Sequence, residues 1–148
     1  MNKIVLPNEI MLGEVSRMLA EGREVVIMTK GFSMLPFIRG EADSVVLVKK
    51  DDIRPGDIAL GEIAEGVYVL HRVRKVLPGG VVLKGDGNLR GTENCRAAKL
   101  CGVVKEIQKA SGRKVNPDSA WNRFLWRCWV LIPTLGRRFI LHFARKSK

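Results

Sequence analysis

The sequence predicts a mainly β protein: an antiparallel β domain with an N-terminal helix and a C-terminal amphipathic helical tail. Three observations predict this class. Short β-branched segments alternate with turn signals between residues 23 and 107, a helical apolar pattern precedes them, and a basic, aromatic segment follows them. With 148 residues, the chain has the size of one domain with appendages. We expect residues 1–118 to form the β domain with its helix and residues 119–148 to form the tail.

The first expected element is an amphipathic helix over residues 9–21. Apolar residues recur there at spacings of three and four, as they do on one face of a helix. Pro7 and Asn8 precede this pattern, and Gly22 follows it as a stop signal.

The middle of the chain consists of short segments rich in valine and isoleucine. Turn signals at residues 55–57 and 78–80 separate some of these segments, and the second one predicts a hairpin. Residues 30–36 are expected to form a loop, and the polar residues 108–119 predict a boundary or linker before the tail. The expected strands cover residues 23–29, 44–49, 58–60, 66–77, 81–84 and 100–107.

The net charge of +11 is concentrated in the tail. The chain has 26 Lys and Arg against 15 Asp and Glu. Every acidic residue lies within residues 1–118, which carry +4, whereas the last thirty residues carry +7 and all three tryptophans. Such a balance indicates a polyanionic partner or an anionic membrane surface. A hydrophobic fraction of 46% argues against a disordered or collagen-like chain.

The tail is apolar, but Pro133, Gly136 and several arginines interrupt it. A straight spanning helix needs about 20 apolar residues, so we expect none here. Tryptophans and phenylalanines flanked by arginines suit a segment at the level of lipid headgroups, on an anionic membrane surface reached through residues 119–148. The other interpretation is a helix that packs on the β domain with its basic face in water. The sequence leaves both open.

Three polar residues lie in sequence contexts that would suit catalytic side chains. Ser33 follows Gly31 in a loop that ends at Pro36, His71 lies in an apolar strand, and Asp86 lies in a Lys-Gly-Asp-Gly-Asn turn. Each alone has an ordinary structural explanation: a local hydrogen bond, a satisfied core histidine or a turn cap. Their order along the chain is more informative.

The ordered set of motifs resembles the signal peptidase family. The resemblance covers roughly residues 25–107 and is closest to the branch found in archaea, the endoplasmic reticulum and some Gram-positive bacteria. It implies a β catalytic domain of the signal-peptidase/LexA-like type, with Ser33 as nucleophile and His71 as general base. Such a serine needs a neighbouring base, and imidazole titrates near neutral pH. The matching segments are residues 31–36 (GFSMLP), 54–58 (RPGDI), 71–73 (HRV), 84–88 (KGDGN) and 102–104 (GVV).

The carboxylate that would support the base is ambiguous. Asp86 matches the Gly-Asp of the family's motif, but the family's second aspartate, six residues further on, is replaced by Thr92, with Glu93 next to it. Either Asp86 or Glu93 is therefore expected to support His71. A second departure is Gly31, which stands where the family often has a serine that supplements the oxyanion hole. Losing one such donor slows other enzymes about 100–1000-fold.

These residues predict a serine endopeptidase that cleaves a leader or signal-type peptide after small residues, with a peptide or protein substrate as its partner. The alternative is a catalytically weak or inactive module of this type that binds a peptide, an anionic membrane or nucleic acid. Nucleic acid is the less favoured ligand. LexA-type repressors use a lysine base and add a helical DNA-binding domain, and the segment before Arg23 is too short for one.

No cofactor or metal is expected. His71 and His142 lie far apart, the three cysteines lack zinc-site spacing, and no glycine-rich nucleotide loop occurs. The N-terminal apolar stretch is too short for a signal peptide, so we expect neither a signal peptide nor the N-terminal anchor usual in signal peptidases. We expect a cytoplasmic protein or one peripheral to the membrane, unless the tail is a re-entrant or spanning segment that delivers the domain outward. The oligomeric state stays open.

Overall fold

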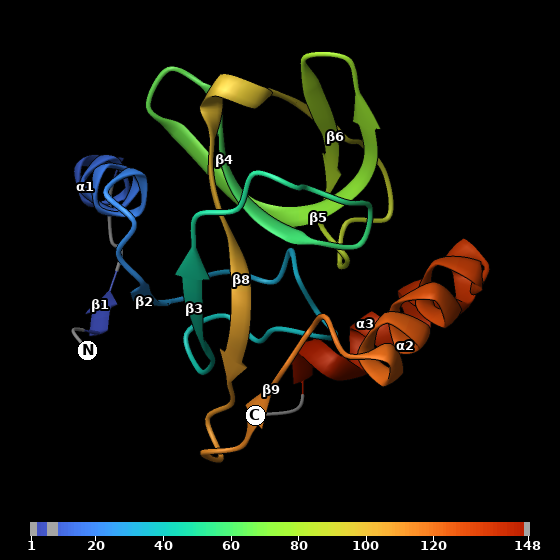
Figure 1. Ribbon diagram of the computed structural model, residues 1–148. Helices are drawn as coiled ribbons and strands as arrows, with labels where there is room; N and C mark the ends of the chain where they lie inside the picture. Colours follow the sequence, from blue (N-terminus) through green and yellow to red (C-terminus); the bar gives the residue numbers. More distant parts are fainter. Residues whose placement is uncertain (1–2, 6–8, 147–148) are drawn as a thin grey trace.

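A computed structural model describes residues 3–5 and 9–146 of the chain. Within them, nine strands form one curled sheet, accompanied by three α-helices and a short 3-10 turn (Figure 1). The predicted mainly β class is therefore confirmed. The elements are β1 (Lys3–Val5), α1 (Glu9–Ala20), β2 (Val25–Met28), β3 (Ser44–Val48), β4 (Ile58–Ala64), β5 (Val67–Leu77), β6 (Gly80–Lys84), β7 (Glu93–Arg96), η1 (Ala97–Lys99), β8 (Leu100–Gln108), β9 (Lys114–Val115), α2 (Ala120–Leu131) and α3 (Thr134–Lys146).

The sheet is antiparallel except at one edge. Its order is β1-β2-β3-β8-β4-β5-β6-β7, with β9 paired to β8, and only β1 and β2 run parallel among the described strands. The long strand β8 joins the β2–β3 part of the sheet to the curled β4–β7 part (Figure 1). This placement puts the loop after β2 close to the middle of β5.

Helix α1 covers one face of the sheet and forms the first core. Val15 and Leu19 are fully buried in a cluster with apolar residues of β2, β3 and β8. The predicted helix over residues 9–21 is present and ends at Ala20. Its predicted start signal, Pro7 and Asn8, lies outside the described residues.

A second core lies inside the curl of the sheet. Val73 of β5 and Leu83 of β6 are fully buried, and Val103 of β8 packs in the same cluster. Side chains alternate along a strand, so these residues face inward while their chain neighbours face the other way. The eleven-residue strand β5 is the longest of the sheet, and it carries both His71 and Arg72.

Three of the described strands were not predicted. Strand β7 has the polar sequence ENCR, yet it pairs along its length with β6. Residues 108–119, expected as a boundary or linker before the tail, contain the two-residue strand β9, in which Val115 pairs with Ile107 at the end of β8. Strand β1 is the third. Whether such a short segment forms a strand depends more on its pairing with an adjacent strand than on the β propensity of its own residues.

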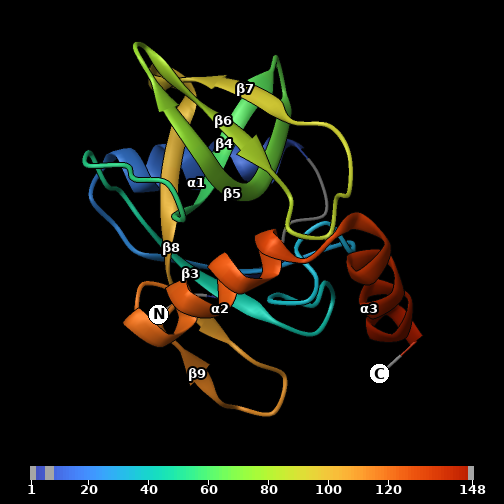
Figure 2. The same cartoon turned by 90° about the vertical axis from the view of Figure 1, so that its right-hand side faces the viewer.

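The tail forms two helices, α2 and α3, on the same side of the sheet (Figure 2). They are separated near Pro133, as expected for a tail without a straight long helix. Trp129 and Leu141 are buried in a third cluster with Leu35, which comes from the loop after β2. One face of the tail therefore packs on the β domain. None of the helices in the described part of the chain combines the length and apolar character needed to cross a membrane.

Candidate functional site

Ser33 lies in a tight loop between β2 and β3, with its side chain partly exposed. Gly31 opens the loop with a φ of 75°, in the left-handed region that glycine adopts without strain. The loop after β6 packs against the Ser33 loop, and its Gly87 amide donates a hydrogen bond of 2.8 Å to the Ser33 carbonyl oxygen. A side chain at Gly87 would overlap the carbonyl oxygen of Phe32, so this close approach requires glycine.

His71 lies inside the curl on β5 and is only 6% exposed. Its Nδ1 is 2.6 Å from Oε1 of Glu93, the first residue of β7. The sheet register explains how they meet. Val73, Leu83 and Glu93 are cross-strand neighbours in one row over β5, β6 and β7. His71 is two residues from Val73 and projects from the same face, and the curl brings its ring to the Glu93 carboxylate.

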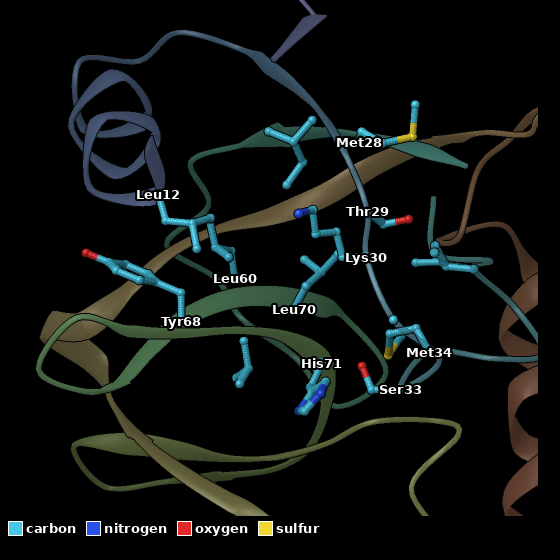
Figure 3. Close-up of a pocket in the computed structure, with 15 residues that line it drawn as sticks. Leu12, Met28, Thr29, Lys30, Ser33, Met34, Leu60, Tyr68, Leu70 and His71 are labelled. Carbon is cyan, nitrogen blue, oxygen red and sulfur yellow. The ribbon is translucent and has the colours of Figure 1, made fainter. Parts of the chain in front are cut away.

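Ser33 and His71 share a pocket of about 210 Å³. Figure 3 shows the two side chains next to each other at one end of it, with the Ser33 hydroxyl on the side of the His71 ring. When Nδ1–H of a neutral imidazole donates to Glu93, Nε2 remains as a hydrogen-bond acceptor. A serine hydroxyl beside a histidine that is oriented by a carboxylate is the arrangement that activates serine as a nucleophile.

Asp86, the other carboxylate expected near His71, contacts Arg72 instead. The Arg72 guanidinium reaches both of its oxygens, with 2.7 Å between Nη2 and Oδ2, and both side chains are only 3% exposed. Consecutive strand residues point to opposite faces, so His71 and Arg72 need separate acidic partners. Burial raises the pKa of Asp86, and the charge and hydrogen bonds of Arg72 oppose this rise.

Helix α2 of the tail covers this buried ion pair. The Arg72 guanidinium carbon lies 5.3 Å from the ring centroids of both Phe37 and Trp126, within the range of cation–π attraction. The indole Nε1–H of Trp129 donates a 2.8 Å hydrogen bond to the Asp86 carbonyl oxygen. The tail therefore supports β5 and the loop after β6, the two segments that adjoin the Ser33 loop.

The pocket beside Ser33 also contains residues that the sequence did not single out. Apolar side chains from α1, β2, β4 and β5 line most of it, and Lys30 and Tyr68 add polar atoms. Lys30 is exposed, and its side chain extends over the pocket in Figure 3. The role of Arg72 was also missed. The available signal was its place directly after His71 in a strand, where alternation separates the two side chains.

The cysteines lie apart from this pocket, and the two in the β domain are poor nucleophiles. Burial raises the pKa of the Cys95 and Cys101 thiols, which favours their protonated form. Neither lines the pocket beside Ser33, and Cys128 is an exposed thiol on α2. Within the described residues, no group of three or more His, Cys, Asp and Glu side chains is placed to hold a metal ion.

Comparison with known proteins gives no family assignment. No protein-family model matches the chain, and no curated protein matches its sequence. A function must therefore be inferred from the geometry of the site.

Proposed function

We propose that this protein is a serine endopeptidase resembling signal peptidases, with Ser33 as nucleophile, His71 as general base and Glu93 as the carboxylate that orients the base. The observation that carries the proposal is the 2.6 Å contact between His71 Nδ1 and Glu93 Oε1, beside Ser33 in one pocket. The curled antiparallel sheet is compatible with a signal-peptidase/LexA-like fold. The proposed substrate is a leader or signal-type peptide.

The proposed reaction has two steps. The Ser33 hydroxyl oxygen bonds to the carbonyl carbon of the scissile peptide while its proton passes to His71 Nε2, and Glu93 stabilises the resulting imidazolium. The tetrahedral intermediate expels the amine, which takes the proton from Nε2 and leaves an ester on Ser33. Water then loses a proton to His71 while its oxygen bonds to the ester carbonyl carbon. The ester bond breaks, the acyl group leaves as a carboxylic acid, and His71 returns the proton to the Ser33 oxygen.

The pocket beside Ser33 is proposed to hold the substrate residue that precedes the scissile bond. Its lining is mostly apolar, so a small aliphatic side chain would lose its hydration without leaving a polar group unpaired. The backbone N–H of Ser33 would donate to the oxyanion. Because Gly31 has no hydroxyl to add a second donor, we expect turnover to be slow, by about the 100–1000-fold that one such donor contributes elsewhere.

A cleavage assay tests the catalytic residues. The purified chain is incubated with a proteome-derived peptide mixture, and new N-termini are identified by mass spectrometry. We expect Ser33→Ala and His71→Ala to abolish these termini. Glu93→Gln keeps the size of the side chain but removes its charge, and is expected to lower the rate by about 10⁴-fold, as the corresponding carboxylate-to-amide change does in a serine protease triad.

The matched control is Glu65→Gln, which removes the charge of an exposed glutamate in the turn between β4 and β5. We expect its cleavage rate to equal that of the unmodified chain. Circular dichroism of each variant shows whether it is folded. Cleavage by a folded Ser33→Ala variant at the original rate would rule out the proposed nucleophile.

The second candidate function is a peptide-binding module without turnover. Gly31 favours it, because the oxyanion site has one donor fewer. The replacement of the family's second aspartate by Thr92 favours it less, since Glu93 offers a carboxylate to His71 Nδ1. Peptides that are retained by the chain but not cut would support this alternative.

A further inference from the structure

Both helices of the tail carry exposed apolar side chains on a side that does not pack on the β domain. We call these two sets of side chains together the α2–α3 face. The Trp121 and Phe124 rings stack at 5.8 Å on α2, and the Phe139 and Phe143 rings lie 4.9 Å apart on α3. Its large apolar side chains are 39–80% exposed: Trp121, Phe124, Leu131, Leu135, Phe139, Ile140 and Phe143.

The spacing of these residues places them in one stripe on each helix. On α2, residues 121, 124 and 131 follow steps of three and seven, and on α3, residues 135, 139 and 143 follow steps of four. Such steps return to the same side of a helix. Scattered apolar side chains are normal on a protein surface, but two aromatic stripes on adjoining helices indicate an interaction site.

Cations of the tail flank both stripes. Residues 119–148 contain no Asp or Glu. Arg127, Arg138, Arg145 and Lys146 are exposed, and within the described part of the chain they form no ion pair. An apolar stripe edged by arginine and lysine is the pattern of a helix that lies in the plane of an anionic lipid surface.

A basic hollow beside α3 adds a place for phosphate groups. Arg138, His142 and Arg145 of α3 line it, together with Arg90 from the loop between β6 and β7. Residues 87–89 and Leu141 complete the lining, which contains no acidic side chain. Three guanidinium groups around one hollow can bind phosphate oxygens through charge-assisted hydrogen bonds.

The basic hollow adjoins the Ser33 loop through Arg145. Phe32, the residue before Ser33, is 49% exposed, and the Arg145 guanidinium carbon lies 5.6 Å from the centroid of its ring. The loop that contributes Arg90 to the hollow also donates the Gly87 hydrogen bond to the Ser33 carbonyl oxygen. A ligand held by α3 and this loop would therefore lie near the mouth of the site.

We propose that the α2–α3 face docks on the surface of an anionic membrane, with its aromatic side chains at headgroup level and its cations on the lipid phosphates. Charge complementarity selects this occupant, because a second copy of the chain would bring a second set of unpaired cations against the first. The proposal does not rest on the peptidase proposal. If both hold, docking presents the Ser33 pocket to peptides at the membrane.

Vesicle binding by the full chain tests the proposal. Co-sedimentation is compared between vesicles of phosphatidylcholine mixed with phosphatidylglycerol and vesicles of phosphatidylcholine alone. We expect binding to the mixed vesicles only, weakening as salt is raised, with a blue shift of the fluorescence of exposed Trp121. Ser33→Ala should bind as the unmodified chain does, which separates docking from catalysis.

Two double variants remove the two parts of the surface. Phe139→Ser with Phe143→Ser deletes the aromatic stripe of α3, and Arg127→Glu with Arg138→Glu reverses two cations. Each pair is expected to weaken binding to the mixed vesicles by about tenfold or more. Both pairs are exposed, so the melting temperature should change little.

Matched control variants lie on the β domain. Val76→Ser with Leu77→Ser removes exposed apolar side chains of β5, and Lys75→Glu with Arg96→Glu reverses two exposed cations. We expect both controls to bind vesicles like the unmodified chain.

Four results would overturn the proposal. The first is no binding to mixed vesicles, and the second is equal binding by the tail variants and the unmodified chain. The third is a dimer in analytical ultracentrifugation that the aromatic variant dissociates while vesicle binding stays unchanged. The fourth is binding to duplex DNA that the charge-reversed variant loses without losing vesicle binding.

Discussion

The β domain and the tail differ in where their side chains find partners. Buried carboxylates of the β domain are paired within the chain: Asp43 with Lys109, and Asp86 with Arg72. On the outer face of the tail, cations form no ion pair within the described residues, and large apolar side chains such as Phe139 are exposed. The paired side chains of the β domain therefore stabilise the fold, whereas the side chains on the outer face of the tail remain available for contacts with another molecule or surface.

The side chains on the inner face of the tail find partners within the chain, as those of the β domain do. Arg123 of α2 contacts Asp57 at 2.8 Å and also contacts Asp118. Trp129 hydrogen-bonds to the backbone of Asp86, and Leu141 is buried beside it in the third cluster. The boundary between the two kinds of surface therefore runs along the helices, and stability measurements on matched residues can locate it.

Breaking the buried ion pair is expected to have the largest effect on stability. Arg72→Met leaves Asp86 buried without its cation, and removing one member of such a pair costs about 3–5 kcal/mol. Urea titration should show the free energy of unfolding falling by this amount. The control is Arg54→Met, because Arg54 pairs with Asp118 at a half-exposed site and should lose less than about 1 kcal/mol. Equal losses in both variants would contradict the comparison.

Two leucines of α3 test the two faces of the tail directly. Leu141 is 4% exposed and Leu135 is 75% exposed. Leu141→Ala should lower the free energy of unfolding by about 2–4 kcal/mol, because it leaves a cavity against the β domain. Leu135→Ala should change it by no more than about 0.5 kcal/mol. If Leu135→Ala were the more damaging of the two, the assignment of the inner and outer faces would be wrong.

The smallest expected effect is a pH dependence at the junction of the tail. The hydrogen bond from Arg123 holds the pKa of Asp118 below its ordinary value. This contribution to stability is present above the ordinary aspartate pKa and is lost as the pH falls through the lowered folded-state pKa.

Asp118→Asn should therefore lower the free energy of unfolding at neutral pH, and the difference should vanish in acid. Because Asp118 is 54% exposed, solvent screening limits the effect to less than about 1 kcal/mol. Urea titrations at several pH values measure it, with the exposed Asp51→Asn as control. A difference that grew as the pH fell would show that Arg123 does not act through the charge of Asp118.

Much of the fold could be predicted from local patterns. Six predicted strands and the N-terminal helix are present, because alternation, helical periodicity and turn residues act over a few positions. Strands β1, β7 and β9 could not be predicted in this way. Each is short and is defined by its pairing with a strand already in place, and for β7 that pairing puts Glu93 on the inner face.

The sequence by itself indicated Ser33 and His71 as candidate site residues, because the order of the motifs around them resembles that of the signal peptidase family. Only the tertiary structure shows which carboxylate contacts His71: the register and curl of the sheet bring Glu93 to His71, and alternation along β5 turns Arg72 towards Asp86. The tertiary structure also shows how the tail is placed: one face packs on the β domain and the other is exposed. Composition reports the sum of the charge, whereas contacts between residues distant in sequence determine which charges are paired.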